Sequence, residues 1–329
     1  MRLTLALLAV ALCTPPLTLL GQATPPARAH HSLVYSPAHG GVLLTAGSTP
    51  HDGGQRFEFF NDLWLLDAAG WRRLGTVGSM MSGVALAFDS QRGRLFSLGG
   101  YDGQALGDFR VLEGHQWRVL GPFPGGALAE PGLVYDAARD RLVAFGGSAA
   151  AGGAAGETWE YDGNSWSKRE IAGPPGRQAH VLVYDPQRRR VVLFGGMGAG
   201  APGRPGPRLA DTWEYDGTRW EQRATEGPGA RLGAGATFDS TRGVVLLFGG
   251  AGPAGFLGDT WSWDGTTWRQ LATTGPAPRV MGYLAYDSSR DRTILFGGRK
   301  GWPDGDLNDT WEWDGAAWRA WQAAGGGGP

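Results

Sequence analysis

The amino-acid sequence predicts an all-β protein built from short strands and tight turns. Of its 329 residues, 57 are Gly and 21 are Pro, yet 42% are hydrophobic and 15 are Trp. Glycine at this density disfavours helices, because an interior Gly destabilises a helix by about 1 kcal/mol relative to Ala. The apolar and aromatic residues are nevertheless numerous enough to form a buried core.

A repeated motif divides the chain into six units. The motif begins with an apolar run, VVLFGG at Val191–Gly196, and related runs end at Gly47, Gly100, Gly147, Gly250 and Gly298. The segment DTWEYDGTRW from Asp211 follows this run, and RQAHVLVYD from Arg177 precedes it. Each unit is therefore expected to form four short strands, because β-branched and aromatic runs alternate with turn residues.

Six such units predict a six-bladed β-propeller of four-stranded antiparallel blades. The chain resembles the kelch-repeat family in four features: the Gly-Gly run, the Tyr-Asp or Trp-Asp after the next strand, the Trp at a fixed distance, and the Arg that opens the next unit. The resemblance spans Arg28 to Trp321. It implies a binding scaffold, although some kelch propellers are enzymes. Because each unit carries its own four strands, we expect the ring to close without a strand donated across the seam.

Two units depart from this pattern. The first has Ala46 where the others have the first Gly, and the second has Arg110 where the others have Trp. We expect these departures to distort the two early blades.

The Asp-Gly pairs predict tight hairpins between the third and fourth strands. A two-residue type I′ loop at Asp216-Gly217 would place Trp213 opposite Trp220. The same counting pairs Trp159 with Trp166, Trp261 with Trp268, and Trp311 with Trp318.

Residues 1–23 are predicted to be a signal peptide, and residues 24–329 the propeller. Arg2 precedes an apolar run from Leu3 to Leu12, and Gly21-Gln22-Ala23 offers small residues for cleavage. We therefore expect a secreted or periplasmic protein, and the scarcity of Lys and Ile suggests a GC-rich bacterial genome. The alternative is a lipoprotein acylated at Cys13, the only cysteine.

The composition argues against several classes of function. With 30 basic and 31 acidic residues, the chain has no net field to attract nucleic acid. Pro15 and Pro16 interrupt the one long apolar stretch, so we expect no membrane span. The six His show no zinc-ligand spacing, and no nucleophile elbow or phosphate-binding loop is present. We expect no cofactor, metal-binding or catalytic residue, and a monomer.

The variable loops indicate where a ligand would bind. Alternate connections of an antiparallel blade lie at opposite ends, so the second-to-third and fourth-to-first connections share one end. The second-to-third connections vary most, and functional residues concentrate on loops held by a rigid scaffold. The candidate ligand-binding residues there are Tyr101, Asp102, Phe256, Trp302 and Asp304. Trp302 stands out because it lies outside the repeated pattern, although it could instead fold onto its own loop.

A second candidate set consists of the arginines that open four of the units. These are Arg28, Arg177, Arg231 and Arg279. If the first strand lines the channel, they would converge at one mouth and favour an anionic ligand. The alternative is that each Arg bonds carbonyls or acids of a neighbouring blade.

These observations predict a non-catalytic module that binds a protein or a glycan. The alternative is a carbohydrate-active enzyme, such as a hydrolase, epimerase or lyase, with its site at the channel mouth. Polar residues crowded in the channel, with perturbed pKa values, would favour the enzyme. An apolar channel with aromatic loops outside it would favour binding.

Overall fold

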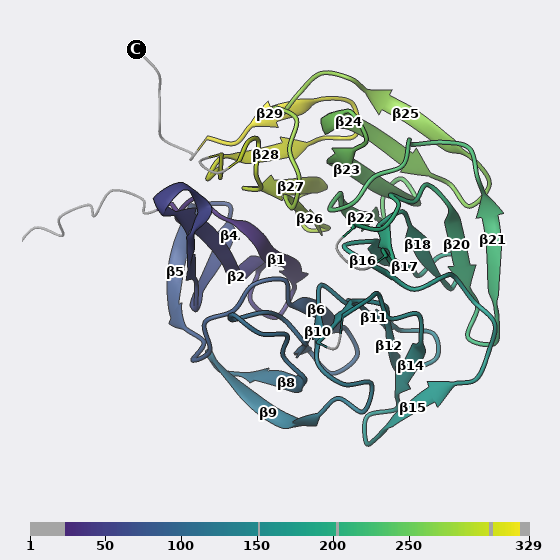
Figure 1. Ribbon diagram of the computed structural model, residues 1–329. Coiled ribbons are helices and arrows are strands. Elements are labelled where there is room, and N and C mark those ends of the chain that lie inside the picture. Colours follow the sequence, from purple (N-terminus) through teal and green to yellow (C-terminus); the bar gives the residue numbers. More distant parts are fainter. Residues whose placement is uncertain (1–23, 151, 202–203, 303–304, 323–329) are drawn as a thin grey trace, which may run out of the picture.

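The computed structural model describes residues 24–150, 152–201, 204–302 and 305–322. Within them, six four-stranded antiparallel sheets follow one another around a central axis (Figure 1). The predicted all-β, six-bladed propeller is confirmed. The predicted signal peptide lies outside the described residues.

Each blade is one contiguous segment of chain. Blades 1 and 2 contain β1 (Ala29–Ser36), β2 (Gly41–His51), β4 (Asp62–Asp67) and β5 (Gly70–Thr76), then β6 (Ala85–Asp89), β7 (Arg94–Leu98), β8 (Asp108–Glu113) and β9 (Gln116–Pro122). Blades 3 and 4 contain β11 (Gly132–Asp136), β12 (Arg141–Phe145), β14 (Thr158–Tyr161) and β15 (Trp166–Arg169), then β17 (Val181–Asp185), β18 (Arg190–Phe194), β20 (Thr212–Tyr215) and β21 (Trp220–Ala224). Blades 5 and 6 contain β22 (Gly235–Asp239), β23 (Val244–Gly252), β24 (Gly255–Trp263) and β25 (Trp268–Ala272), then β26 (Tyr283–Asp287), β27 (Arg292–Phe296), β28 (Thr310–Trp313) and β29 (Trp318–Ala320).

Short additional elements decorate the connections. They are the 3₁₀ turn η1 (Asp52–Gly54) and the strands β3 (Arg56–Phe59), β10 (Leu128–Ala129), β13 (Ser148–Ala149), β16 (Arg177–Gln178) and β19 (Met197–Gly198). β3 pairs with β2, β10 with β13, and β16 with β19. The last two pairs join a fourth-to-first connection to the second-to-third connection of the following blade, so both kinds of connection lie at one end of the ring. We call this end the loop face and the opposite end the turn face.

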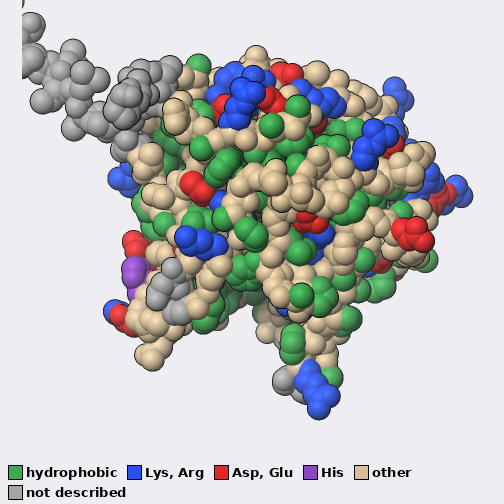
Figure 2. All heavy atoms as spheres, turned by 90° about the horizontal axis from the view of Figure 1, so that it is seen from above, with side chains coloured by type: hydrophobic (Ala, Val, Ile, Leu, Met, Phe, Trp, Pro, Cys, Tyr) green, Lys and Arg blue, Asp and Glu red, His purple; other side chains and the backbone are tan. Residues whose placement is uncertain are grey.

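The first strand of every blade is innermost, and the fourth forms the rim (Figure 1). The six inner strands contact their neighbours around the axis. Seen edge-on, the ring carries two projections at one of its ends, with a hollow between them (Figure 2).

The hydrophobic core lies between the faces of neighbouring blades. Between blades 4 and 5, Val192 and Phe194 pack with Val245, Leu247 and Trp263 in one buried cluster. Each blade face is covered only when the next blade is in place, so the core ties the blades into one ring.

A hydrogen bond between tryptophan and threonine repeats at the blade interfaces. The Trp at the start of a fourth strand donates its indole N–H to the Thr that opens the third strand of the preceding blade. These bonds of 2.8–2.9 Å join Trp71 to Thr310, Trp220 to Thr158, Trp268 to Thr212 and Trp318 to Thr260. In blades 1 and 2 the Thr is replaced by Leu63 and Phe109. The indole N–H groups of Trp117 and Trp166 accordingly have no hydrogen-bond partner in the described chain.

The seam between blade 6 and blade 1 is closed by the same contacts as the other interfaces. Trp71 bonds to Thr310 across it. The Gly298 N–H donates to the Arg28 carbonyl at 2.9 Å, and the Arg28 N–H donates to the Leu307 carbonyl at 3.1 Å. Within the described residues no strand of either terminal blade pairs with the other. The prediction of closure without a donated strand is confirmed.

The predicted register of the Asp-Gly hairpins was wrong. Tyr215 pairs with Trp220, whereas Trp213 pairs with Gln222. The same shift separates Trp159 from Trp166, Trp261 from Trp268, and Trp311 from Trp318. Asp216 Oδ1 accepts hydrogen bonds from the Thr218 N–H at 2.7 Å and the Arg219 N–H at 2.9 Å, so the turn contains four residues rather than two.

The departures in the two early blades leave the four-strand order intact, although β3 is added to blade 1 and β7 pairs with β8 over three residues only. Ala46 has φ of 61°, close to the 66° of Gly99 at the same position in blade 2. A non-glycine residue therefore adopts the left-handed conformation there, at a cost of about 1–2 kcal/mol.

Candidate functional site

The four arginines that open their units lie inside the blades. Their side chains are at most 2% exposed. Arg177 donates to the Gly195 carbonyl at 3.0 Å and to both oxygens of Asp211 at 2.6 and 2.9 Å. The equivalent pairs are Arg28–Asp62, Arg231–Asp259 and Arg279–Asp309.

These contacts make the arginines connectors of strands. They bond carbonyls and acids, as the alternative interpretation held, but the acids belong to the same blade. The main chain supplies the link between blades, because the Arg177 carbonyl accepts from the Gly147 N–H of blade 3 at 2.9 Å. Burial raises the pKa of Asp211, but hydrogen bonds from Arg177 and Trp213 outweigh this and leave it below its ordinary value. The guanidinium groups thus point into the blades and do not line the channel mouth.

An exposed aromatic patch lies on the loop face. Six large hydrophobic side chains are exposed among the described residues, and four of these belong to loop-face connections: Phe57, Met80, Tyr101 and Trp302. Monomeric proteins rarely leave such side chains together at the surface unless they bind something. With the half-buried Phe59, these residues are called the loop-face patch.

The patch crosses three blades. The rings of Phe57 in blade 1 and Trp302 in blade 6 have centroids 6.1 Å apart. The rings of Phe59 and of Tyr101 in blade 2 are also 6.1 Å apart. Met80 belongs to the connection that leads into blade 2, and the N–H of its neighbour Met81 donates to the Phe60 carbonyl at 3.4 Å, next to Phe59 in the chain.

A buried ion pair supports Trp302. Arg299 donates to both oxygens of Asp306 at 2.6 and 3.1 Å, and both side chains are less than 10% exposed. The Arg299 guanidinium carbon lies 4.9 Å from the centroid of the Trp302 ring, within the range of a cation–π contact. Trp302 is 60% exposed, so it rests on its own loop and still presents its ring to solvent.

The other three predicted loop residues lie in different places. Asp102 is exposed beside Tyr101. Phe256 is half-buried and packs with Ala29, Val280 and Met281, away from the patch. Asp304 lies outside the described residues.

Phe59 and Met80 were not predicted, and Phe57 was expected on the loop face but was not among the candidate ligand-binding residues. The phenylalanines stand two positions apart in RFEF, and such residues lie on the same side of a strand, a signal that the sequence did contain. The charged residues of β3 pair on its other side: Arg56 donates to Asp52 at 2.6 Å, and His51 contacts Glu58 at 3.0 Å. The phenylalanines of β3 thus add apolar surface to the patch, while its charged side chains bind partners on the other side.

The axial channel is mostly apolar. One residue from each inner strand lines both of its cavities, and we call these six residues the leucine ring: Leu33, Leu86, Leu133, Leu182, Ala236 and Leu284. Cavities of about 150 Å³ towards the loop face and about 360 Å³ towards the turn face meet at this ring.

A few polar groups line the smaller cavity, and none forms a nucleophile–base pair. Glu130 contacts His30 Nδ1 at 2.7 Å, and Ser32 donates to the Val84 carbonyl at 2.6 Å. Burial lowers the pKa of His180 to about 3, and its ring nitrogens have no hydrogen-bond partner among the described residues. Burial also raises the pKa of Tyr283. In the part of the chain that the structure describes, no group of three or more His, Cys, Asp or Glu is placed to hold a metal ion.

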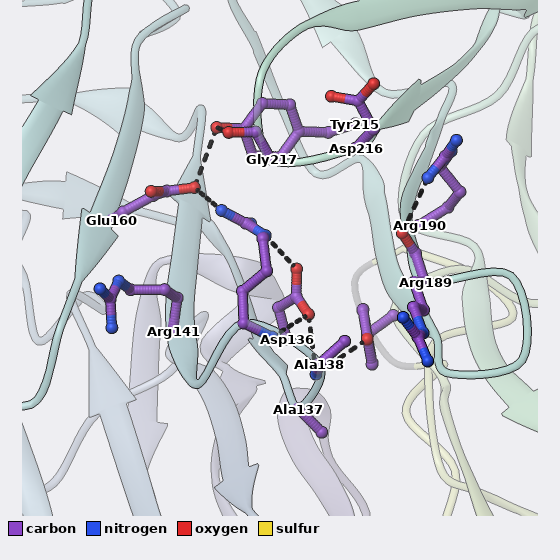
Figure 3. A network of polar contacts seen from close by, with 12 residues as sticks. Asp136, Ala137, Ala138, Arg141, Glu160, Arg189, Arg190, Tyr215, Asp216 and Gly217 are labelled. Carbon is purple, nitrogen blue, oxygen red and sulfur yellow. Dashed lines mark hydrogen bonds and ion pairs between the residues drawn. The ribbon is translucent and has the colours of Figure 1, made fainter.

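A charged network on the turn face is structural. Figure 3 shows Asp136, Glu160 and Tyr215 gathered between blades 3 and 4. Arg139 bridges Asp136 and Glu160, and the Tyr215 hydroxyl donates to Glu160 at 2.9 Å. Arg188 and Arg290 make the same bridges in blades 4 and 6. Because the charged side chains of this network form ion pairs with one another, none of them is left to act as a catalytic acid or base.

Comparison with known families agrees with the propeller fold. The family described as the KLHDC2/KLHL20/DRC7 Kelch-repeats domain matches residues 132–327. The chain belongs to the kelch-repeat family. Kelch propellers commonly act as protein-binding modules, which is consistent with a non-catalytic role here. A separate comparison of the chain with curated proteins finds no match. Within the described residues, no helix of this kelch propeller is long and apolar enough to span a membrane.

Proposed function

We propose that this kelch propeller is a non-catalytic module that binds a protein through the loop-face patch. The observation that carries this proposal is the exposure of Trp302, Phe57 and Tyr101 on one face, each beside another aromatic ring or a buried ion pair. Aromatic side chains held in this way contribute most to protein interfaces, because little conformational entropy is lost when they bind.

The channel supports binding over catalysis. Its two cavities meet at five Leu and one Ala. An enzyme acting on a sugar at this mouth would need a pair of groups with matched pKa values within hydrogen-bond reach of the substrate. The exposed aromatic and apolar side chains of the patch favour an apolar protein segment over an acidic glycan.

The proposal includes export, and the exported protein is proposed to be a monomer. The basis for export is the signal-peptide pattern of residues 1–23. The mass of the exported protein tests where the signal peptide is cleaved. A mature chain beginning near Thr24 is expected. A lipid attached at Cys13 would instead place the protein on a membrane surface.

The binding proposal is tested with peptides selected from a displayed random library against immobilised residues 24–329. Trp302→Ala and Phe57→Ala are each expected to weaken the selected peptides at least tenfold. The matched control is Val119→Ala, which removes an exposed hydrophobic side chain from β9 and is expected to change nothing.

Selected peptides that bind Trp302→Ala as tightly as the wild type would overturn the assignment of the site. A glycan array run in parallel distinguishes the ligand class. Glycan binding that disappears with Trp302→Ala, without any peptide binding, would replace the protein partner by a glycan.

A further inference from the structure

The turn-face end of the channel has a different character from the loop face. Each inner strand places an aromatic residue two positions after its member of the leucine ring. These residues are Tyr35, Phe88, Tyr135, Tyr184, Phe238 and Tyr286. Together with the leucine ring they line the cavity of about 360 Å³, which we call the axial funnel.

The lining of the axial funnel contains no charged residue among those that the structure describes. The remaining positions are small or apolar, such as Ala137 and Pro186 at the rim. Cavities of about 300 Å³ and above, lined by apolar and aromatic side chains with a few polar groups, are typical sites for small molecules.

The charged side chains nearest the funnel form ion pairs with one another. In blade 2, Arg92 donates to both oxygens of Asp140 at 2.6 Å, and Arg242 of blade 5 pairs with Asp291 at 2.7 Å. The hydroxyls of Tyr135 and Tyr286 donate to these same two acids at 2.7 and 2.8 Å. These two tyrosine rings are therefore fixed in place before any ligand arrives, which lowers the entropic cost of binding.

Two hydroxyl groups of the funnel make no hydrogen bond to any residue that the structure describes: that of Tyr35 in its wall and that of the exposed Ser90 at its rim. Tyr184, by contrast, accepts a hydrogen bond from the Ala138 N–H at 3.2 Å. A ligand in the funnel would thus meet aromatic and aliphatic walls, with the Tyr35 hydroxyl free to form a hydrogen bond with it.

The leucine ring has one smaller member. Five of its residues are Leu and the sixth is Ala236 in blade 5. An Ala fills less space than the Leu at this position in the other five blades, so blade 5 leaves the most room for a ligand.

We propose that the axial funnel is a second binding site, specific for an uncharged, largely apolar small molecule that carries an aromatic ring and one hydrogen-bonding group. The site lies at the opposite end of the ring from the loop-face patch. It is therefore independent of the protein-binding function proposed above.

The test uses the fluorescence of N-phenyl-1-naphthylamine, an uncharged aromatic amine, titrated with residues 24–329. Saturable binding at one site per chain is expected. Ala236→Leu completes the leucine ring with the residue that five blades already carry, and it is expected to weaken the probe at least tenfold. The control Ala316→Leu makes the same change in an exposed turn of blade 6 and is expected to leave the affinity unchanged.

A second variant keeps the proposal testable if Ala236→Leu does not fold. Tyr35→Phe removes only the unpaired hydroxyl, and Phe already stands at this position in blades 2 and 5. It is expected to weaken the probe threefold or more at an unchanged melting temperature. Trp302→Ala is expected to leave probe binding intact, which separates this site from the loop-face patch. Absence of saturable binding to the wild type, or equal affinity for wild type and a folded Ala236→Leu, would overturn the proposal.

Discussion

Arg110 donates a hydrogen bond to Asp108 at 2.8 Å from a position where the other blades carry Trp. It also donates to the Gly99 carbonyl at 3.3 Å. In four other blades these two acceptors, the Asp and the carbonyl, are served by the Arg that opens the unit. Blade 2 has Met81 at that opening position, so Arg110 delivers the missing guanidinium group from the neighbouring strand.

This exchange predicts coupling between positions 81 and 110. Arg110→Trp alone should destabilise the protein by about 1–3 kcal/mol, because it removes the guanidinium from Asp108 and leaves the Gly99 carbonyl without its donor. The new indole N–H can replace only one bond to Asp108, as Trp213 does to Asp211. Met81→Arg combined with Arg110→Trp restores the arrangement of the other blades and should recover most of that loss. Urea unfolding of the two single variants and the double variant gives the interaction energy. Strictly additive changes would show that the two positions do not substitute for one another.

Arg177 should matter for stability and not for the loop-face patch. Arg177→Ala, alone or with Arg231→Ala, leaves a partly buried Asp unpaired, a change that costs about 3–5 kcal/mol for a buried pair. Melting temperature and capture of the selected peptides are measured together, with the exposed Arg204→Ala as control. Weakened capture at an unchanged melting temperature would return the arginines to the ligand site.

The two tryptophans of each Asp-Gly hairpin should differ in their contributions. Trp220 is buried and bonds to Thr158 of the preceding blade, so Trp220→Ala should cost about 3–5 kcal/mol. Trp213 is half-buried over the Arg177–Asp211 pair, and its removal should cost less. Trp220→Phe keeps a ring and loses the hydrogen bond, which is worth about 1 kcal/mol. If unfolding assays ranked Trp213→Ala above Trp220→Ala, the register described here would be incorrect.

The buried His180 should make the fold sensitive to mild acid. Its pKa is lowered from 6.5 to about 3, mainly by burial and also by Arg177. The unfolded chain therefore takes up a proton below pH 6.5 that the folded chain refuses until about pH 3. The free energy of unfolding should fall across this window by about 1.4 kcal/mol per pH unit for this residue.

The matched variant for this titration is His180→Val, since Val84 stands at the same position in blade 2. Denaturant unfolding at pH 7, 6 and 5 should show a shallower loss of stability for His180→Val than for the wild type. The buried His31, whose pKa is also lowered by burial, should supply the remaining slope. Identical slopes for the two proteins would mean that His180 is protonated in the folded state.

The repeats made the architecture predictable, because six similar units can bury their apolar faces only against one another. They could not reveal which way a repeated side chain points. Arg177 and Asp211 are 34 positions apart, and their pairing is visible only when the opening segment lies beside the third strand. A signal was nevertheless present: Leu128 opens blade 3, and there the acid is Glu157, which pairs with Lys168 instead.

The prediction of the hairpin register was wrong for a local reason. A type I′ loop was expected from the Asp-Gly pair alone, whereas the Asp side chain binds two further N–H groups and widens the turn. At the loop-face patch, sequence reasoning identified Tyr101 and Trp302 because both lie in irregular connections. It missed Phe59, which belongs to a strand that no other blade contains.

The seam between blades 6 and 1 has a dynamic consequence. Every other pair of neighbouring blades is joined by a covalent connection, whereas this interface is held by packing and by bonds such as Trp71 to Thr310. Local opening of the ring should therefore begin here. Phe57 and Trp302 stand on opposite sides of this gap. A partner that covers both would act as a clasp, because it can bind only the closed ring and its binding free energy is added to the work of opening.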